Sequence, residues 1–159
     1  MIRDAETLTQ LTDTIARFVR ERLVPAEQQV AETDTIPEDI VADMKAMGLF
    51  GLSIPEEYGG LGLTMEEEVL VAFELGRTSP AFRSLMGTNN GIGAQGILID
   101  GSEEQKQKYV PPLATGDVIG AFCLTEPDVG SDSGAVKMRA QRDGDHYILN
   151  GTKRYITNG

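Results

Sequence analysis

The sequence predicts a mainly α-helical chain that ends in an antiparallel β-segment. Apolar residues recur at steps of three and four through most of residues 1–100, which is the period of a helix face, and at steps of two from Val118 onward. Asp143-Gly144 and Asn150-Gly151 are hairpin turn signals in this second part. We therefore expect an N-terminal α-helical bundle domain over residues 1–117 and the first strands of an antiparallel β-domain over residues 118–159.

The first thirty residues predict a long amphipathic helix with a break. Pro25 lies inside the apolar pattern and has no backbone N–H, so the helix should kink there or divide into two segments. The residues on the apolar face are Leu8, Leu11, Ile15, Phe18, Val19, Leu23, Ala26 and Val30.

Capping signals predict where the next helices begin. Thr35-Ile36-Pro37-Glu38 has the form of a capping box with Pro37 at the first helical position, and Gly48 suits the left-handed residue at the end of that helix. Residues 49–55 are too short and too rich in glycine for another helix and predict an extended connection. Thr64 with Glu67 predicts the cap of a third helix.

Two further helices follow in the prediction. Ser79-Pro80 opens a fourth helix that ends near Gly101. Ser102 with Gln105 forms a capping box before a short helix over residues 105–109, which Pro111-Pro112 stops.

The β-segment is expected to contain several short strands. Residues 118–124 are mostly apolar, residues 136–141 alternate as a half-buried strand requires, and residues 147–149 and 155–157 suggest consecutive antiparallel strands. A meander of this length exposes strand edges and cannot close a sheet by itself. We therefore expect the chain to be a fragment of a longer protein.

Composition excludes several classes of partner. Of the 159 residues, 25 are acidic and 14 are basic, and this net charge of -11 argues against nucleic acid binding. The one cysteine, Cys123, permits no internal disulfide or cysteine zinc site, so we expect a reducing compartment, the cytoplasm, and no metal. No apolar run approaches the about 18 residues of a membrane span, and the N-terminus lacks a signal-peptide pattern.

The segment over residues 123–134 carries the residue types for a binding site. A predicted strand leads into a loop with the hydroxyls of Thr125, Ser131 and Ser133 and with two glycines. Backbone donors and hydroxyls in such a loop can hold an anion or the edge of a heterocycle. The alternative is that these hydroxyls only satisfy the backbone of a turn.

Four motifs in order resemble the acyl-CoA dehydrogenase family. Leu124-Thr125-Glu126-Pro127 followed by Gly130-Ser131-Asp132 is similar to the family's first signature, and residues 54–62, 101–109 and 150–159 resemble its other motifs. The resemblance covers essentially the whole chain. It implies an N-terminal helical domain, a middle β-domain and a C-terminal helical domain that this chain lacks.

The resemblance also implies an activity and a cofactor. Members are FAD enzymes of fatty acid metabolism, including β-oxidation, that perform α,β-dehydrogenation of acyl-CoA thioesters with hydride transfer from Cβ to flavin N5. The glutamate base comes from the C-terminal helices, so no catalytic residue is expected here and the chain alone should be inactive. Glu126 is expected to be structural, and Asp128 to point to solvent.

Carried over residue by residue, the resemblance implies which positions bind the cofactor. The Thr125 hydroxyl would lie near the pyrimidine edge of the flavin, Ser131 near a phosphate or the CoA chain, and the Thr157 hydroxyl near N5. The full expected set is Phe122, Cys123, Leu124, Thr125, Gly130, Ser131, Tyr155, Ile156 and Thr157.

The acyl pocket of the family is closed partly by the fourth helix. This implies Ser84, Leu85, Thr88 and Gly91 as lining residues, with Ser131 also near the substrate. The alternative is that Leu85 belongs to the helix core and Gly91 only permits close packing.

We expect no functional role for two other residues. His146 is expected to be an exposed strand residue and Cys123 a core residue.

The implied partners are an acyl-CoA substrate and an electron-transfer flavoprotein or similar acceptor, with a homo-oligomer in the full-length protein. Two other interpretations remain open at this point. One is a non-catalytic helical interaction module. The other is a fragment of a related acyl-CoA oxidase or nitroalkane oxidase, which has the same fold.

Overall fold

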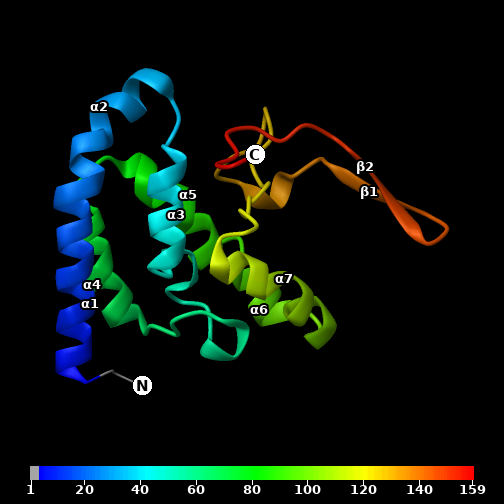
Figure 1. The fold of residues 1–159 in the computed structure, drawn as a ribbon. Helices are drawn as coiled ribbons and strands as arrows, with labels where there is room; N and C mark the ends of the chain where they lie inside the picture. Colours follow the sequence, from blue (N-terminus) through cyan, green and yellow to red (C-terminus); the bar gives the residue numbers. More distant parts are fainter. Residues whose placement is uncertain (1–3) are drawn as a thin grey trace. The chain divides into compact units, whose positions relative to one another are not determined.

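The computed structural model describes residues 4–159, which form two compact units. The first unit extends to Gly120 and contains helices α1 to α7, and the second, Ala121–Gly159, contains the hairpin of β1 and β2. Figure 1 shows the helices and the hairpin in chain order. The predicted fold class, mainly helical with a short antiparallel segment, is confirmed.

The first helical segment divides as expected. Helix α1 spans Ala5–Phe18, a π-helical turn η1 spans Val19–Leu23, and α2 spans Val24–Thr33. Pro25 lies directly after the π-helical turn and has no N–H to donate to a carbonyl of that turn. The helix thus divides near Pro25 as predicted, but the division is a π-helical turn within a continuous helical path.

Helix α3 spans Glu38–Ala46 but does not begin with the predicted capping box. Pro37 occupies the N-cap position, and the Thr35 hydroxyl donates instead to the backbone oxygen of Thr33 at 3.2 Å. The prediction placed Pro37 at the first helical position, whereas the helix begins one residue later, at Glu38. Its end agrees with the prediction, because Gly48 adopts a left-handed φ of 71°.

The connection after α3 lies in the core. Residues 49–55 were expected to be extended, but Leu49–Gly51 forms a 3-10 turn, η2. Burial explains the difference, because a compact turn places successive apolar side chains in the interior. Four of them, Leu49, Phe50, Leu52 and Ile54, are fully or almost fully buried.

A glycine loop closes against this connection after the short 3-10 turn η3, Glu56–Tyr58. The backbone N–H of Leu61 donates to the Gly51 carbonyl at 2.7 Å. A Cβ atom at Gly60 would overlap the carbonyl group of Ile54. Glycine is therefore required at position 60 by the close approach of two backbone segments.

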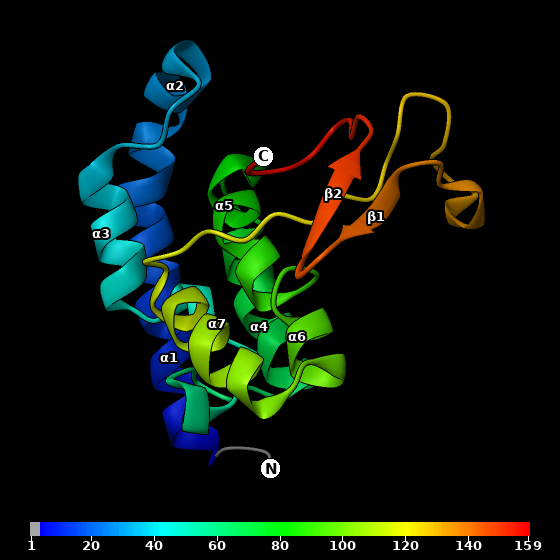
Figure 2. The ribbon, with the colours of Figure 1, turned by 90° about the vertical axis from the view of Figure 1, so that its right-hand side faces the viewer.

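Helix α4, Met65–Leu75, begins at the predicted cap. The Glu67 N–H donates to the Thr64 hydroxyl at 3.4 Å, and the Thr64 N–H donates to the Glu67 carboxylate at 2.7 Å. Helix α4 lies beside α1 in both ribbon views (Figures 1 and 2). Val71 and Leu75 are buried, whereas Phe73 is 67% exposed.

The predicted fourth helix is two helices. Helix α5 spans Pro80–Asn90, and α6 spans Gln95–Asp100. The turn between them depends on Gly93, whose N–H donates to the Thr88 carbonyl at 2.7 Å. A Cβ atom at Gly93 would lie 2.6 Å from that oxygen, which is a steric clash, so this turn requires glycine at position 93.

Helix α7 spans Glu103–Thr115 and starts with the predicted Ser102 capping box. The predicted stop at Pro111-Pro112 is wrong, because both prolines lie inside the helix. Val110 and Leu113, on either side of them, are buried, and this packing offsets the donors that proline lacks. Among the described residues, no helix has both the length and the apolar character to cross a bilayer.

Asn89 on α5 links this helix to the end of α7 and to the backbone that follows it. Its fully buried side chain donates to the carbonyls of Leu113 and Val118, both at 2.8 Å, and accepts from the Gly120 N–H at 2.7 Å. Residues 118–124 were expected to form a strand, but they form none. Their backbone is partly satisfied by this side chain and has no neighbouring strand to pair with.

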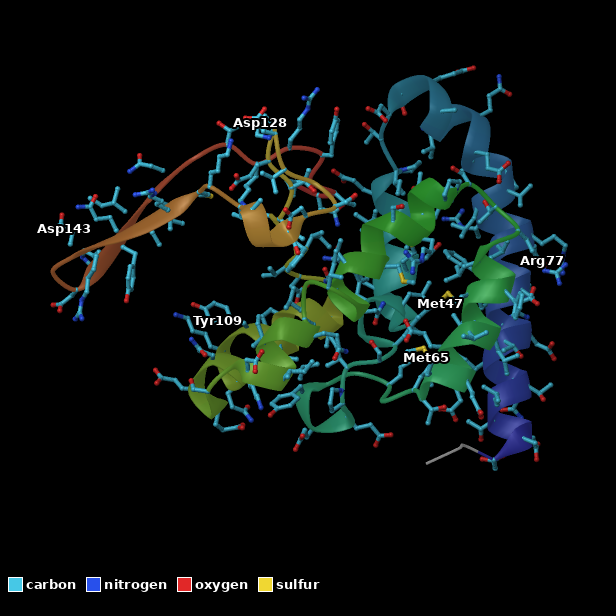
Figure 3. All side chains as sticks on the ribbon, turned by 180° about the vertical axis from the view of Figure 1, so that it is seen from behind. Met47, Met65, Arg77, Tyr109, Asp128 and Asp143 are labelled. Carbon is cyan, nitrogen blue, oxygen red and sulfur yellow. The ribbon has the colours of Figure 1, made fainter. Side chains whose placement is uncertain are left out.

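The second unit contains one two-stranded sheet. Strand β1, Arg139–Asp143, pairs antiparallel with β2, His146–Asn150, through a two-residue turn (Figure 2). Gly144 has a φ of 58°, which confirms the predicted hairpin turn. The predicted half-buried strand over residues 136–141 is found only in part: Val136 and Met138 are half-buried but precede β1, and Ala140 is exposed like every residue of both strands. His146 is an exposed strand residue, as predicted. Figure 3 shows Asp143 at the tip of the hairpin.

The predicted second hairpin at Asn150-Gly151 is also wrong. Residues 151–159 form no strand, and Tyr155 adopts a left-handed φ of 57°. The N–H of Arg154 donates to the Thr125 carbonyl at 2.8 Å, so this segment bonds to the earlier loop rather than returning along β2.

We predict that Asn89→Leu lowers the free energy of unfolding of the chain by about 3 kcal/mol or more. Three backbone groups lose this partner, the Leu113 carbonyl in the interior and the Val118 carbonyl and Gly120 N–H in partly buried positions. Each buried group left unsatisfied costs about 1–3 kcal/mol. Urea unfolding followed by circular dichroism measures the change. Gln28→Leu, at an exposed position on α2, is the control and should change stability by less than about 0.5 kcal/mol. Equal stability of both variants would contradict this role of Asn89.

Candidate functional site

The candidate site is built on the buried carboxylate of Glu126. This residue begins a tight turn in which its N–H donates to the Val129 carbonyl at 2.9 Å and its carbonyl accepts from the Val129 N–H at 3.2 Å. Glu126 is 7% exposed, whereas Asp128 at the tip of the turn is exposed, as predicted (Figure 3). The turn therefore directs one carboxylate inward and the other to solvent.

Three donors satisfy the Glu126 carboxylate. The backbone N–H of Lys137 donates to Oε2 at 2.8 Å, and that of Met138 donates to Oε1 at 2.8 Å. The Lys153 ammonium lies 3.1 Å from Oε1 and is itself largely buried, with 15% of its side chain exposed. These two backbone donors, with the Lys153 charge, hold the pKa of Glu126 below its ordinary value of 4.5.

Lys153 links the Glu126 carboxylate to the loop before it. Its ammonium also donates to the Leu124 carbonyl at 2.9 Å. One residue later, the Arg154 N–H donates to the Thr125 carbonyl at 2.8 Å. The facing ends of two segments, residues 122–125 and residues 154–157, are thus fixed beside each other.

Several hydrogen-bond donors in these segments are left without a protein partner. Within residues 4–159, no backbone N–H of residues 122–125 donates to another group. The hydroxyls of Thr125, Ser131 and Thr157 likewise have no hydrogen-bond partner in the described part of the chain. Unsatisfied donors gathered on neighbouring segments are the groups that a polar ligand requires.

The same segments expose large apolar side chains. Phe122 is 47% exposed, Leu124 37% and Tyr155 79%. Tyr155 has a positive φ of 57°, a sparsely populated conformation for a bulky residue. The Arg154 guanidinium carbon lies 4.6 Å from the centre of the Tyr155 ring. Strain of this kind occurs often at binding sites, where the surrounding structure enforces it.

The predicted cofactor residues are brought together in part. Phe122, Leu124 and Thr125 lie on one of the paired segments, and Tyr155, Ile156 and Thr157 lie on the other. Gly130 and Ser131 follow the Glu126 turn and are both exposed. The prediction that Cys123 is a core residue is wrong, because it is exposed on a segment that no strand covers.

Sequence reasoning missed Lys153 and the backbone donors of Lys137 and Met138. Lys153 lies within one of the family-like motifs, but nothing local to it indicates a bond with Glu126. A backbone N–H has no sequence signature at all. These partners become visible only when the chain has folded.

The exposed groups fit a flavin. An isoalloxazine ring has polar atoms along one edge and at N5, which need donors, and broad apolar faces, which need large side chains. For a flavin bound here, the backbone N–H groups of residues 122–125 and the Thr125 and Thr157 hydroxyls would be the available donors. Phe122, Leu124 and Tyr155 would be the available apolar surface.

The helical unit contains a separate cavity of about 550 Å³. Its walls come mainly from α4 and α5. Of the predicted acyl-pocket residues only Gly91 lines it; Thr88 is buried, and Leu85 packs against the hydrophobic core. Ser84 is half-buried and is absent from the lining. The lining residues are Ser53, Leu63, Met65, Glu68, Val69, Ala72, Arg83, Asn90, Gly91 and Gln95.

Comparison with known sequences matches both units. The family described as "Acyl-CoA dehydrogenase, N-terminal domain" matches residues 5–117, and "Acyl-CoA dehydrogenase, middle domain" matches residues 121–159. An acyl-CoA dehydrogenase of Bacillus subtilis is 41% identical over 142 residues, which cover 89% of this chain and 38% of that relative. The chain thus spans about two fifths of that relative's length.

Solved structures give the same result. A Bacillus anthracis acyl-CoA dehydrogenase complexed with FAD aligns with a TM-score of 0.86 and 33% identity, over 97% of this chain and 27% of that one. A glutaryl-coenzyme A dehydrogenase in complex with glutaryl-CoA aligns with a TM-score of 0.85 and 36% identity, over 98% of this chain and 40% of that one. These matches cover the N-terminal and middle domains of acyl-CoA dehydrogenases. The chain belongs to the acyl-CoA dehydrogenase family.

We predict that Glu126 stabilises the second unit at neutral pH and loses this effect in acid. Because folding lowers the pKa of Glu126, the stabilisation is complete above pH 4.5 and falls as the pH decreases through the folded pKa. The amide shifts of Lys137 and Met138 in NMR spectra should report a titration midpoint below 4.5. Glu126→Gln should abolish it, and a wild-type midpoint at or above 4.5 would contradict the prediction.

Proposed function

We propose that the chain forms the N-terminal and middle-domain part of an FAD-dependent acyl-CoA dehydrogenase. The observation that carries this proposal is a pair of segments, residues 122–125 and 154–157, whose facing ends are held together by Lys153 and Arg154. These segments carry exposed apolar side chains and donors that have no partner within the described part of the chain. Membership of the family and the likeness to a structure complexed with FAD support it.

In this proposal the protein residues bind and orient the cofactor. The Thr125 hydroxyl and the backbone N–H groups of residues 122–125 would hold the pyrimidine edge, and the Thr157 hydroxyl would hold N5. Bound FAD supplies the acceptor for the hydride that leaves Cβ of the thioester. Donors that are already fixed stabilise the negative charge of the reduced ring without reorganising, which is an electrostatic contribution to catalysis.

Glu126 and Lys153 position these donors without acting on the substrate. Each is largely buried, and each forms bonds to more than one segment of the unit. Supporting contacts of this kind keep a binding group in its productive position. Glu126 is a poor general base, because three donors occupy its carboxylate and lower its pKa.

We infer that the base for the α-proton belongs to the part of the family's polypeptide that this chain does not match. The substrate is then an acyl-CoA thioester, which the likeness to a complex with glutaryl-CoA supports. The family resemblance further supports an electron-transfer flavoprotein or similar acceptor, a homo-oligomeric full-length enzyme and a cytoplasmic location.

The first test is the colour of the purified protein. The chain alone should be colourless at about 450 nm, because only part of the flavin site is present. The complete polypeptide should be yellow and should lose its colour when an acyl-CoA is added without oxygen, as hydride reduces the flavin. Anaerobic absorbance spectroscopy measures both results.

A panel of acyl-CoA thioesters of different length and branching serves as the substrate set, with free CoA as the control. Bleaching by at least one thioester and none by CoA supports dehydrogenation. The proposed function would be contradicted by a complete polypeptide that contains no flavin. It would also be contradicted by a flavin colour that persists with every thioester.

A further inference from the structure

The two segments that we propose bind the flavin contain one charged side chain, that of Arg154. Residues 122–125 and 155–157 carry only uncharged side chains. Arg154 is exposed, and its guanidinium forms no ion pair and no hydrogen bond with any group of residues 4–159. Its positive charge is therefore not neutralised by the part of the chain that the structure describes.

The two lysines around the Glu126 turn are paired with carboxylates. The Lys153 ammonium lies 3.1 Å from Oε1 of Glu126, and the Lys137 ammonium lies 3.6 Å from the Asp128 carboxylate. A charge and its partner cancel much of each other's field at a distance. The field of Arg154, by contrast, reaches an adjacent ligand without being weakened by an ion pair.

Two contacts hold Arg154 in place. Its backbone N–H donates to the Thr125 carbonyl at 2.8 Å. Its guanidinium carbon lies 4.6 Å from the centre of the Tyr155 ring, within the about 6 Å over which a cation is attracted to an aromatic face. The residue is thereby tied to both segments, to Thr125 through its backbone and to Tyr155 through its charge.

We propose that the Arg154 charge raises the reduction potential of the flavin bound at these segments. This inference rests on the proposed function. Reduction by hydride adds two electrons and one proton to the ring, which thereby gains one negative charge, while Arg154 exchanges neither electrons nor a proton. A fixed cation beside the ring stabilises the reduced form more than the uncharged oxidised form, and charge near the ring is one means by which a protein tunes its cofactor.

The charge of the whole protein gives a local cation this importance. The net charge of -11 lies entirely in residues 1–120, because residues 121–159 contain five acidic and five basic side chains. An anionic protein disfavours the formation of a further negative charge. The unpaired cation at Arg154 offsets this effect in the segment where we expect the new charge to form.

The test is the midpoint potential of FAD in the complete protein, measured without substrate by anaerobic titration against a reference dye. Arg154→Met should make the equilibrium for reduction about tenfold less favourable, the effect of one charge across a partly solvated gap. For a two-electron couple this is a midpoint about 30 mV more negative. The affinity for oxidised FAD should stay within about threefold, because the oxidised ring has not gained the charge.

Matched variants separate the charge from its packing. Arg154→Lys keeps a cation that can lie on the same ring, and should keep the equilibrium for reduction within about threefold of the wild type. Arg142→Met removes the same charge from the hairpin, where the Arg142 side chain donates to the Gly144 carbonyl at 3.2 Å, and should leave the midpoint unchanged. In a Tyr155→Leu protein, adding Arg154→Met should change the equilibrium by less than about threefold, because the guanidinium has already lost the ring that holds it.

The outcomes separate this inference from the proposed function. If FAD is bound and thioesters bleach it, but Arg154→Met has the midpoint of the wild type, the inference is contradicted and the dehydrogenase remains. Equal falls in Arg154→Met and Arg142→Met would also contradict it, because they would indicate the net charge of the protein and not the position of Arg154. A complete polypeptide without flavin, or with a flavin that no thioester reduces, contradicts the proposed function and this inference with it.

Discussion

The second unit depends on one carboxylate that is buried and fully hydrogen-bonded. Glu126 is linked to residues 137 and 138 by their backbone N–H groups and to Lys153 by charge, and Lys153 extends the network to the Leu124 carbonyl. The two strands of this unit are exposed throughout, so they bury no apolar side chains to hold it together. In their place, a small polar network fixes the loop, and its pairing is essential because an unpaired buried charge is costly.

In this arrangement, one set of polar groups stabilises the fold and another set is left for a ligand. The Glu126 carboxylate and the Lys153 ammonium are paired within the protein, whereas the nearby N–H groups of residues 122–125 and the Thr157 hydroxyl have no partner among residues 4–159. In the helical unit, Asn89 is likewise occupied by hydrogen bonds within the protein. In the second unit, the polar groups that have no partner in the described part of the chain are the ones we assign to a ligand.

Local signals in the sequence are sufficient for the starts of α4, α5 and α7, but not for the start of α6 or for features set by distant contacts. The caps at Thr64 and Ser102 each involve residues three apart, so their geometry follows from a few neighbouring side chains. Helix α7 continues through Pro111 because residues far along the chain cover its apolar face, which no local rule records. The family-like motifs identified both segments that we propose bind the flavin. They did not indicate the bond between Glu126 and Lys153, because it joins residues 27 positions apart.

The most direct test of this account is the FAD affinity of the complete protein with Glu126→Gln, compared with Glu104→Gln at an exposed position on α7. Glutamine at position 126 would turn an amide NH₂ toward one donor and leave Lys153 without its charge partner. We predict that the dissociation constant for FAD rises about tenfold or more at position 126 and is unchanged at position 104. Equal FAD affinity in both variants would contradict the claim that this carboxylate organises the flavin site.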